Sequence, residues 1–293
     1  MSAVPIVFAV DDSYRVPLLV ALESLCVSQP AGARGLTVVV LHEGLDERTR
    51  ADIAAVAADH DLDLVLRRAE LPDLPYNTAF GGARANYLRL AIPAAVAAAD
   101  RAVYLDADIV VRGDLRPLLD ADLRGLPFGA VQDTVNPTLA DGRALPGWQE
   151  LGLDGDRAYF NSGVMVFDLA ECRRDGLFER AFRAVAEHPR HLRLWDQDAL
   201  NLAARDRWHR LPRRFNTIPL SALRRTPWIR LPPERLPTDA ALAAEEADAV
   251  VMHYVSPSKP WRGLLPAGPA ADTYSLHLHA VTRRVAGTTR KGT

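Results

Sequence analysis

Two carboxylates stand two residues apart inside an apolar stretch of the chain. Residues 104–111 read Tyr-Leu-Asp-Ala-Asp-Ile-Val-Val, which places Asp106 and Asp108 where a short buried strand is predicted to end. Side chains at positions i and i+2 of an extended segment leave on the same face, so both can bind one hard divalent cation, and we expect them to face solvent. Such a cation would neutralise a diphosphate. Because Asp-x-Asp alone is a weak motif, the alternative explanation for the two carboxylates is a solvated turn after the strand.

A histidine and a lysine near the end of the chain could complete this site. His253 follows an apolar segment, and together with two carboxylates it suits Mn²⁺ better than Mg²⁺, because imidazole favours the later metal. Lys259 can reach a phosphate oxygen as a point charge. Lysine occurs only at positions 259 and 291, whereas every other basic residue is arginine, so we expect lysine chemistry to be required at 259. A core histidine and an ordinary surface lysine are the alternatives.

Other polar residues have both a structural and a functional explanation. Asp11 could cap the helix predicted to follow it, or its carboxylate could accept a hydrogen bond from a ligand while Tyr14 stacks on that ligand. Asn161 begins a turn-forming Asn-Ser-Gly sequence. Asp196 stands at a predicted helix start, where a carboxylate is favourable to the helix dipole. None of these residues decides the function alone.

Composition and charge exclude several classes of protein. A length of 293 residues allows one large α/β domain, and a net charge of −2 gives no basic field for nucleic acid. We expect no signal peptide and no membrane-spanning segment. Cys26 and Cys172 lack the spacing of metal ligands, so we expect free thiols in a reducing cytoplasm.

Strands alternate with helices along the first half of the chain. Apolar runs predict strands at 4–10, 36–41, 62–66, 128–131, 161–169 and 249–254. Helical patterns cover 47–58, 83–92, 115–119, 176–187 and 196–204. This alternation predicts an α/β fold with a mostly parallel sheet. Ligands bind beyond the carboxyl ends of such strands, which puts Asp11, Ser13, Asp106 and Asp108 on one rim.

The remaining segments have weaker patterns. Residues 134–158 should be irregular, and the proline- and arginine-rich residues 211–237 should form an extended connection. We expect one domain over residues 1–265 and a helical, basic tail over 266–293. Because the tail is weakly amphipathic, it could pack on the domain, fray, or contact an anionic membrane surface peripherally.

Four patches of sequence, in this order and spacing, resemble the retaining glycosyltransferases of family 8, which include glycogenin and bacterial lipooligosaccharide galactosyltransferases. The patches are Phe-Ala-Val-Asp-Asp-Ser-Tyr from residue 8, residues 104–111, residues 160–169 followed by Trp-Asp-Gln-Asp from residue 195, and His-Tyr-Val-Ser-Pro-Ser-Lys-Pro-Trp from residue 253. The resemblance implies a nucleotide-binding α/β core of the GT-A type. It also implies a UDP-sugar donor and a metal, Mn²⁺ or Mg²⁺, held by Asp106, Asp108 and His253.

The same resemblance assigns further roles to individual residues. It implies contacts to the nucleotide, diphosphate or donor sugar for Ala9, Asp11, Ser13, Tyr14, Arg89, Asp106, Ala107, Asn161, Ser256 and Lys259. In this group the Asp11 carboxylate would accept the imide N–H of uracil while Tyr14 stacks on the ring. The resemblance implies catalytic positions for Asp196 and Gln197 at the sugar hydroxyls and for Asp133 facing the acceptor. Ser256 departs from the family, which usually has glycine there, a residue that lets the backbone approach a diphosphate. Residues 75–84 also lack the histidine of the galactosyltransferases, so galactose specificity does not follow.

The predicted function is metal-dependent transfer of a hexose from a UDP-sugar to a hydroxyl of a glycan, lipid-linked or small-molecule acceptor. Because no carboxylate is clearly placed as a nucleophile, the acceptor should attack on the face that UDP leaves, with Gln197 beneath the anomeric carbon as a stabiliser or a weak nucleophile. A non-catalytic UDP-sugar-binding protein and a nucleotidyltransferase are the alternatives. The second would need a basic, glycine-rich loop where this chain has the acidic Asp11 and Asp12. A phosphatase built on Asp-x-Asp is disfavoured, because the position after Ile109 holds Val110 rather than the usual residue with a hydroxyl group.

Overall fold

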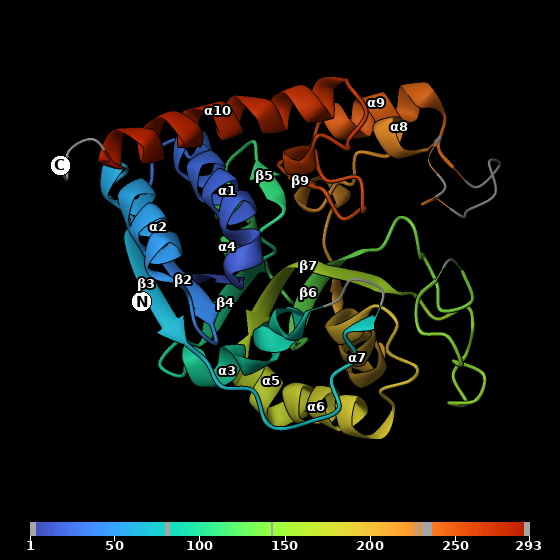
Figure 1. Cartoon of the computed structure of the whole chain (residues 1–293). Helices are drawn as coiled ribbons and strands as arrows, with labels where there is room; N and C mark the ends of the chain where they lie inside the picture. The colour runs from blue at the N-terminus through green and yellow to red at the C-terminus, as the bar shows by residue number, and fades with distance from the viewer. Residues whose placement is uncertain are drawn as a thin grey trace.

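A computed structural model describes residues 4–79, 83–141, 143–224, 226, 228–229 and 236–289. Its centre is a seven-stranded sheet in the order β3-β2-β1-β4-β7-β6-β8 (Figure 1). These strands are β1 (Ile6–Ala9), β2 (Thr37–His42), β3 (Asp63–Arg68), β4 (Arg101–Leu105), β6 (Phe128–Gln132), β7 (Phe160–Asp168) and β8 (His209–Arg210). The first four strands in the spatial order pair in parallel, whereas β7 is antiparallel to both β4 and β6. The predicted α/β fold with a mostly parallel sheet is therefore confirmed.

Alternate residues of the central strands pack on opposite faces of the sheet, as the two-residue period of a strand requires. Ile6 and Phe8 of β1 belong to the core formed with α1 (Arg15–Ser28), α2 (Glu47–Asp59) and the last helix, α10 (Pro269–Thr289). Val7 belongs to the opposite core, which receives side chains from η3 (Arg84–Ala91), α5 (Leu169–Asp175), α6 (Leu177–Glu187) and α7 (Trp195–Ala204). Helices thus cover both faces of the sheet.

A second, two-stranded sheet, which was not predicted, follows the strand that ends before Asp106. Strand β4 ends at Leu105, and β5 (Ile109–Val111) pairs instead with β9 (Val251–His253), in antiparallel register. Ile109 lies opposite His253 in this register. Asp106 and Asp108 consequently lie on the short link between the two sheets.

Several short elements were not predicted. The chain forms α5, β8 and α9 (Asp239–Ala247) where no helix or strand was expected. The predicted extended connection over residues 211–237 contains η4 (Arg213–Phe215) and α8 (Leu220–Leu223), while residues 225, 227 and 230–235 lie outside the described part. The remaining short helices are η1 (Asp12–Tyr14), α3 (Ile92–Ala95), α4 (Arg116–Leu119) and η6 (Pro260–Arg262).

Helix α10 lies along α1 and α2 (Figure 1). Its Tyr274 is fully buried, Val281 is 3% exposed, and Arg284 pairs with Glu23 of α1 and Asp59 of α2. Packing of the C-terminal segment on the domain, one of the three expected outcomes, therefore describes this helix. Among the described residues, no helix is both long enough and apolar enough to cross a membrane.

Candidate active site

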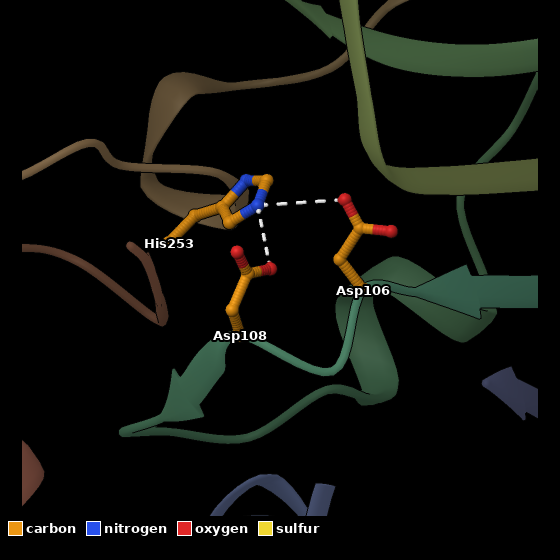
Figure 2. Close-up of side chains that lie close together, drawn as sticks. All are labelled: Asp106, Asp108 and His253. Carbon is orange, nitrogen blue, oxygen red and sulfur yellow. Dashed lines mark ion pairs between the residues drawn. The ribbon is translucent and has the colours of Figure 1, made fainter. Parts of the chain in front are cut away.

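Asp106, Asp108 and His253 meet between the two sheets (Figure 2). One potential ligand atom from each residue lies within 4.8 Å of the others. Nε2 of His253 is 3.5 Å from Oδ2 of Asp106 and 3.2 Å from Oδ1 of Asp108. The β5–β9 pairing produces this convergence, because it brings the end of β9 beside the link that carries the carboxylates. The predicted triad is thus assembled, although Asp108 is only 7% exposed and does not face solvent as expected.

Both carboxylates of this cluster are ionised. Burial would raise the pKa of Asp106, but the Arg89 guanidinium and His253 together outweigh burial and hold that pKa below its usual range. Burial is likewise outweighed at Asp108, where the Lys259 ammonium and His253 together hold the pKa well below the usual range. Burial lowers the pKa of His253, yet its hydrogen bonds to the two carboxylates raise that pKa to about 9. Two ionised carboxylates are therefore present as anionic donors, with Arg89, Lys259 and His253 balancing their charge, and a metal would replace the proton on Nε2.

Arg89 connects the Asp106–Asp108–His253 cluster to the other end of the site. It is 5% exposed, and its guanidinium lies 2.7 Å from Oδ1 of Asp106 and 2.7 Å from Oδ2 of Asp196. It also packs over the Tyr104 ring, 4.4 Å from the centroid. Burial raises the pKa of Asp196 to about 7, although Arg89 opposes that rise. Arg89 thus neutralises two carboxylates, a role that the sequence did not predict.

Lys259 approaches the same cluster from the opposite side. Its ammonium donates to Oδ2 of Asp108 at 2.6 Å and to the carbonyl oxygen of Tyr254 at 2.7 Å. The ammonium also lies 5.2 Å from the centre of the Trp261 ring. Lys259 is therefore held beside Asp108 at the wall of the cavity.

The opposite end of the site consists of amides and carboxylates. Gln197 accepts the backbone N–H of Ser162 at 2.9 Å, and its side-chain nitrogen lies 3.4 Å from Oδ2 of Asp133. Asn161 donates to the same oxygen of Asp133 at 3.1 Å. Trp195, which begins α7, has a left-handed backbone with φ of 54°, and this turn precedes Asp196 and Gln197. A left-handed conformation is strained for a bulky residue and is typical of functional sites.

Asp11 caps the first turn after β1. Its Oδ1 accepts from the backbone N–H of Ser13 at 2.9 Å and from the Ser13 hydroxyl at 2.5 Å. The capping explanation is therefore correct, and it uses only one of the two carboxylate oxygens. Tyr14 follows, with its ring edge against Trp261 at a centroid distance of 5.8 Å.

One cavity of about 520 Å³ joins these parts, a volume typical of small-molecule sites. Its lining includes the following predicted site residues: Ala9, Asp11, Ser13, Tyr14, Arg89, Asp106, Ala107, Asp108, Asp133, Asn161, Asp196, Gln197, His253 and Lys259. Ser256 is the exception. Its side chain is 1% exposed and is not among the described residues that line the cavity, although Val255 and Pro257 are. The prediction that Ser256 contacts the diphosphate is therefore not supported by its position.

Further lining residues were not predicted. They are mostly amides, arginines and tryptophans: Asn86, Asn136, Arg143, Arg193, Trp195, Trp228 and Arg262. Trp195 and Arg262 adjoin motif residues in sequence, so proximity could have indicated them. Asn136 and Arg143 lie in the irregular residues 134–158, where no pattern indicates which side chains turn inward.

This combination of a helix-covered sheet, an Asp-x-Asp link at a strand end and a cavity lined by charged and amide side chains is that of the GT-A glycosyltransferase fold. The sequence model of Glycosyl transferase family 8 matches residues 5–264, and the chain belongs to that family.

Individual relatives agree with this assignment. Lipopolysaccharide 1,2-glucosyltransferase of Escherichia coli K12 is 30% identical over 71% of this chain and 59% of its own length. General stress protein A of Bacillus subtilis is 29% identical over 61% of this chain and 59% of its own. The chain thus spans about three fifths of the length of these curated relatives.

Solved structures have the same fold. The galactosyltransferase LgtC, determined with donor and acceptor sugar analogues, is 27% identical and superposes with a TM-score of 0.72, covering 94% of this chain and 95% of its own. The bifunctional glycosyltransferase WbbM has a TM-score of 0.76 at 21% identity, covering 97% of this chain and 52% of its own. This second likeness concerns the fold alone.

Proposed function

We propose that this chain is a metal-dependent, retaining hexosyltransferase with a UDP-sugar donor. One observation carries the proposal: Asp106, Asp108, His253 and Lys259 cluster in the same cavity that holds Gln197, Asp133 and Asn161. A diphosphate needs concentrated positive charge, and a sugar needs amides and carboxylates that bind hydroxyls. The similarity to LgtC, whose structure contains donor and acceptor sugar analogues, supports this division of the cavity.

The residues present fit a divalent cation. Two ionised carboxylates and an imidazole are a donor set that Mn²⁺ accepts. When bound, the cation would stabilise the charge that develops on the departing diphosphate. Lys259 would add a second positive charge to the leaving group, because its ammonium is already fixed beside Asp108.

The acceptor would attack on the face that UDP leaves. Asp133 accepts the backbone N–H groups of Val135 and Asn136, each at 2.8 Å, and Asp196 is paired with Arg89, so neither is free to act as a nucleophile. The bond from the acceptor oxygen to the anomeric carbon forms while the bond to the β-phosphate oxygen breaks. The acceptor proton passes to that phosphate oxygen, and Gln197 stabilises the sugar.

The first test is a screen of UDP-hexoses for release of UDP with and without EDTA. Slow hydrolysis of the donor needs no acceptor, so release that depends on Mn²⁺ identifies both the donor and the metal requirement. A non-catalytic binding protein would bind the UDP-sugar without releasing UDP.

Gln197→Ala should lower turnover strongly and leave UDP affinity nearly unchanged, because an amide beside the sugar acts mainly in the transition state. Single-turnover kinetics with calorimetry of UDP binding would separate the two effects.

Proton NMR of the first product from an α-linked UDP-hexose should show an α-linkage. A β-linked product would refute retention and indicate a carboxylate base, with Asp133 and Asp196 as the first candidates.

Asp11→Ala should weaken UDP more than it weakens pyrophosphate, by about 1–3 kcal/mol for a lost hydrogen bond to a charged group. The reason is that uracil presents an imide N–H that cytosine and adenine do not offer at this position. The Asp11 cap of η1 would also be lost, so pyrophosphate binding serves as the internal reference. Equal affinity of the native protein for UDP, CDP and ADP would contradict the role of Asp11.

A further inference from the structure

Asn216 is a buried amide beside His253. It is 3% exposed, and its Oδ1 lies 2.8 Å from Nδ1 of the imidazole. The other ring nitrogen, Nε2, is the one that faces Asp106 and Asp108. Asn216 therefore contacts the side of the ring that a metal would not use.

The backbone holds Asn216 in this place. The next residue, Thr217, forms a parallel bridge with Met252 of β9. The N–H of Thr217 donates to the carbonyl of Val251 at 2.9 Å, and the N–H of His253 donates to the carbonyl of Thr217 at 2.8 Å. The segment after η4 is thus hydrogen-bonded along β9, the strand that carries His253.

A backbone donor fixes the direction of every hydrogen bond that leads to the imidazole. The N–H of Gly163 can only donate, and it bonds to Oδ1 of Asn161 at 2.9 Å. That oxygen is therefore an acceptor, and Asn216 must present its amide nitrogen to it, at 2.8 Å. The oxygen of Asn216 then faces His253. Because a carbonyl oxygen only accepts, Nδ1 of His253 must carry a proton.

We propose that Asn216 is a positioning residue that keeps a proton on Nδ1 of His253 and so reserves the lone pair of Nε2 for a divalent cation. This inference rests on the proposed metal-dependent function. Asn161, the middle of the chain of bonds, also donates to Asp133. The orientation of the proposed metal-binding imidazole is consequently linked, through Asn161, to Asp133 at the other end of the cavity.

The first test detects the hydrogen bond itself in the metal-free protein. In wild type, long-range ¹H–¹⁵N spectra should show a proton on Nδ1 of His253 that exchanges slowly with water and has a nuclear Overhauser contact with Asn216. The signal is assigned by its loss in His253→Gln. In Asn216→Leu, which retains bulk but removes the acceptor, the proton should exchange rapidly.

The second test measures Mn²⁺ affinity by calorimetry and electron paramagnetic resonance. Loss of a hydrogen-bond partner behind a metal-binding histidine typically costs about 10–100-fold in affinity, and we expect that loss in Asn216→Leu. Asn216→Asp keeps an acceptor toward Nδ1 and should restore affinity to within a few-fold of wild type. Asn201→Leu is the matched control, because Asn201 is also buried but bonds to the backbone of Phe160 and Gln197.

The outcomes separate the two proposals. Wild-type protein that binds Mn²⁺ but lacks the proton on Nδ1, or Asn216→Leu that binds Mn²⁺ as tightly as wild type, would overturn the role of Asn216 alone. Wild-type protein that shows the proton but does not bind Mn²⁺ would overturn the metal-dependent function and the role of Asn216 with it. Equal losses in Asn201→Leu and Asn216→Leu would show general loosening and would also overturn the assignment.

Discussion

Asp108→Asn is expected to abolish Mn²⁺-dependent binding of UDP. The substitution removes one of two anionic ligands and leaves Lys259 and His253 without the carboxylate that both contact. The loss of affinity should be larger than the reduction of about 10–100-fold that follows removal of a hydrogen-bond partner behind a metal ligand. Asp106→Asn should act in the same direction, because its carboxylate also faces His253. Calorimetric titration of UDP with Mn²⁺ and with EDTA measures the effect.

The control for both variants is Asp248→Asn, which removes a carboxylate that is 65% exposed and 3.8 Å from Arg214. It should bind UDP like the native protein. Circular dichroism would establish that each variant is folded. UDP binding that is indifferent to EDTA and to both substitutions would show that the metal site is wrong.

Gly163→Ala is expected to lower metal affinity and transfer together. A Cβ on Gly163 would lie 2.0 Å from Cε1 of His253, 2.7 Å from its Nδ1 and 2.8 Å from Oδ2 of Asp106, so the imidazole or the strand must move. Movement of the ring displaces a ligand, and movement of β7 strains the core. Calorimetry with Mn²⁺ and thermal unfolding would measure both effects.

Gly44→Ala is the matched control for this substitution, since a Cβ there meets nothing within 4 Å. It should change neither metal affinity nor stability appreciably. Native Mn²⁺ affinity in Gly163→Ala would mean that His253 does not hold its ligand position through contact with Gly163.

The carboxylate pair and the sheet could be predicted because their determinants are local. The i and i+2 spacing predicted Asp106 and Asp108 side by side on a strand, and the structure brings them together on the link between β4 and β5 instead. Alternating apolar strands and helices likewise predicted a mostly parallel sheet, which the pairing of β1, β2, β3 and β4 confirms. No spacing connects His253 and Lys259 to this pair; ligand chemistry, the rarity of lysine and the resemblance to a family indicated them.

The remaining features depend on tertiary contacts that leave no pattern in the sequence. Asn216 lies in a proline- and arginine-rich stretch that predicts only an extended connection, and its importance arises from pairing of the next residue with β9. Arg89 was predicted beside the donor, but its two carboxylate partners come from separate segments of the chain. Ser256 is buried between Val255 and Pro257, which line the cavity, and this burial could not be predicted from the motif.

The position of Lys259 explains why arginine could not serve there in a chain that otherwise avoids lysine. An ammonium group has three donors in a tetrahedral arrangement, and Asp108 and Tyr254 occupy two of them. The third is left for another acceptor, which under the proposed function would be a phosphate oxygen. A guanidinium confines its donors to one plane and would have to give up a partner to reach an oxygen outside that plane. Under the proposed function, the anchored ammonium would therefore contact the protein and the leaving group at the same time.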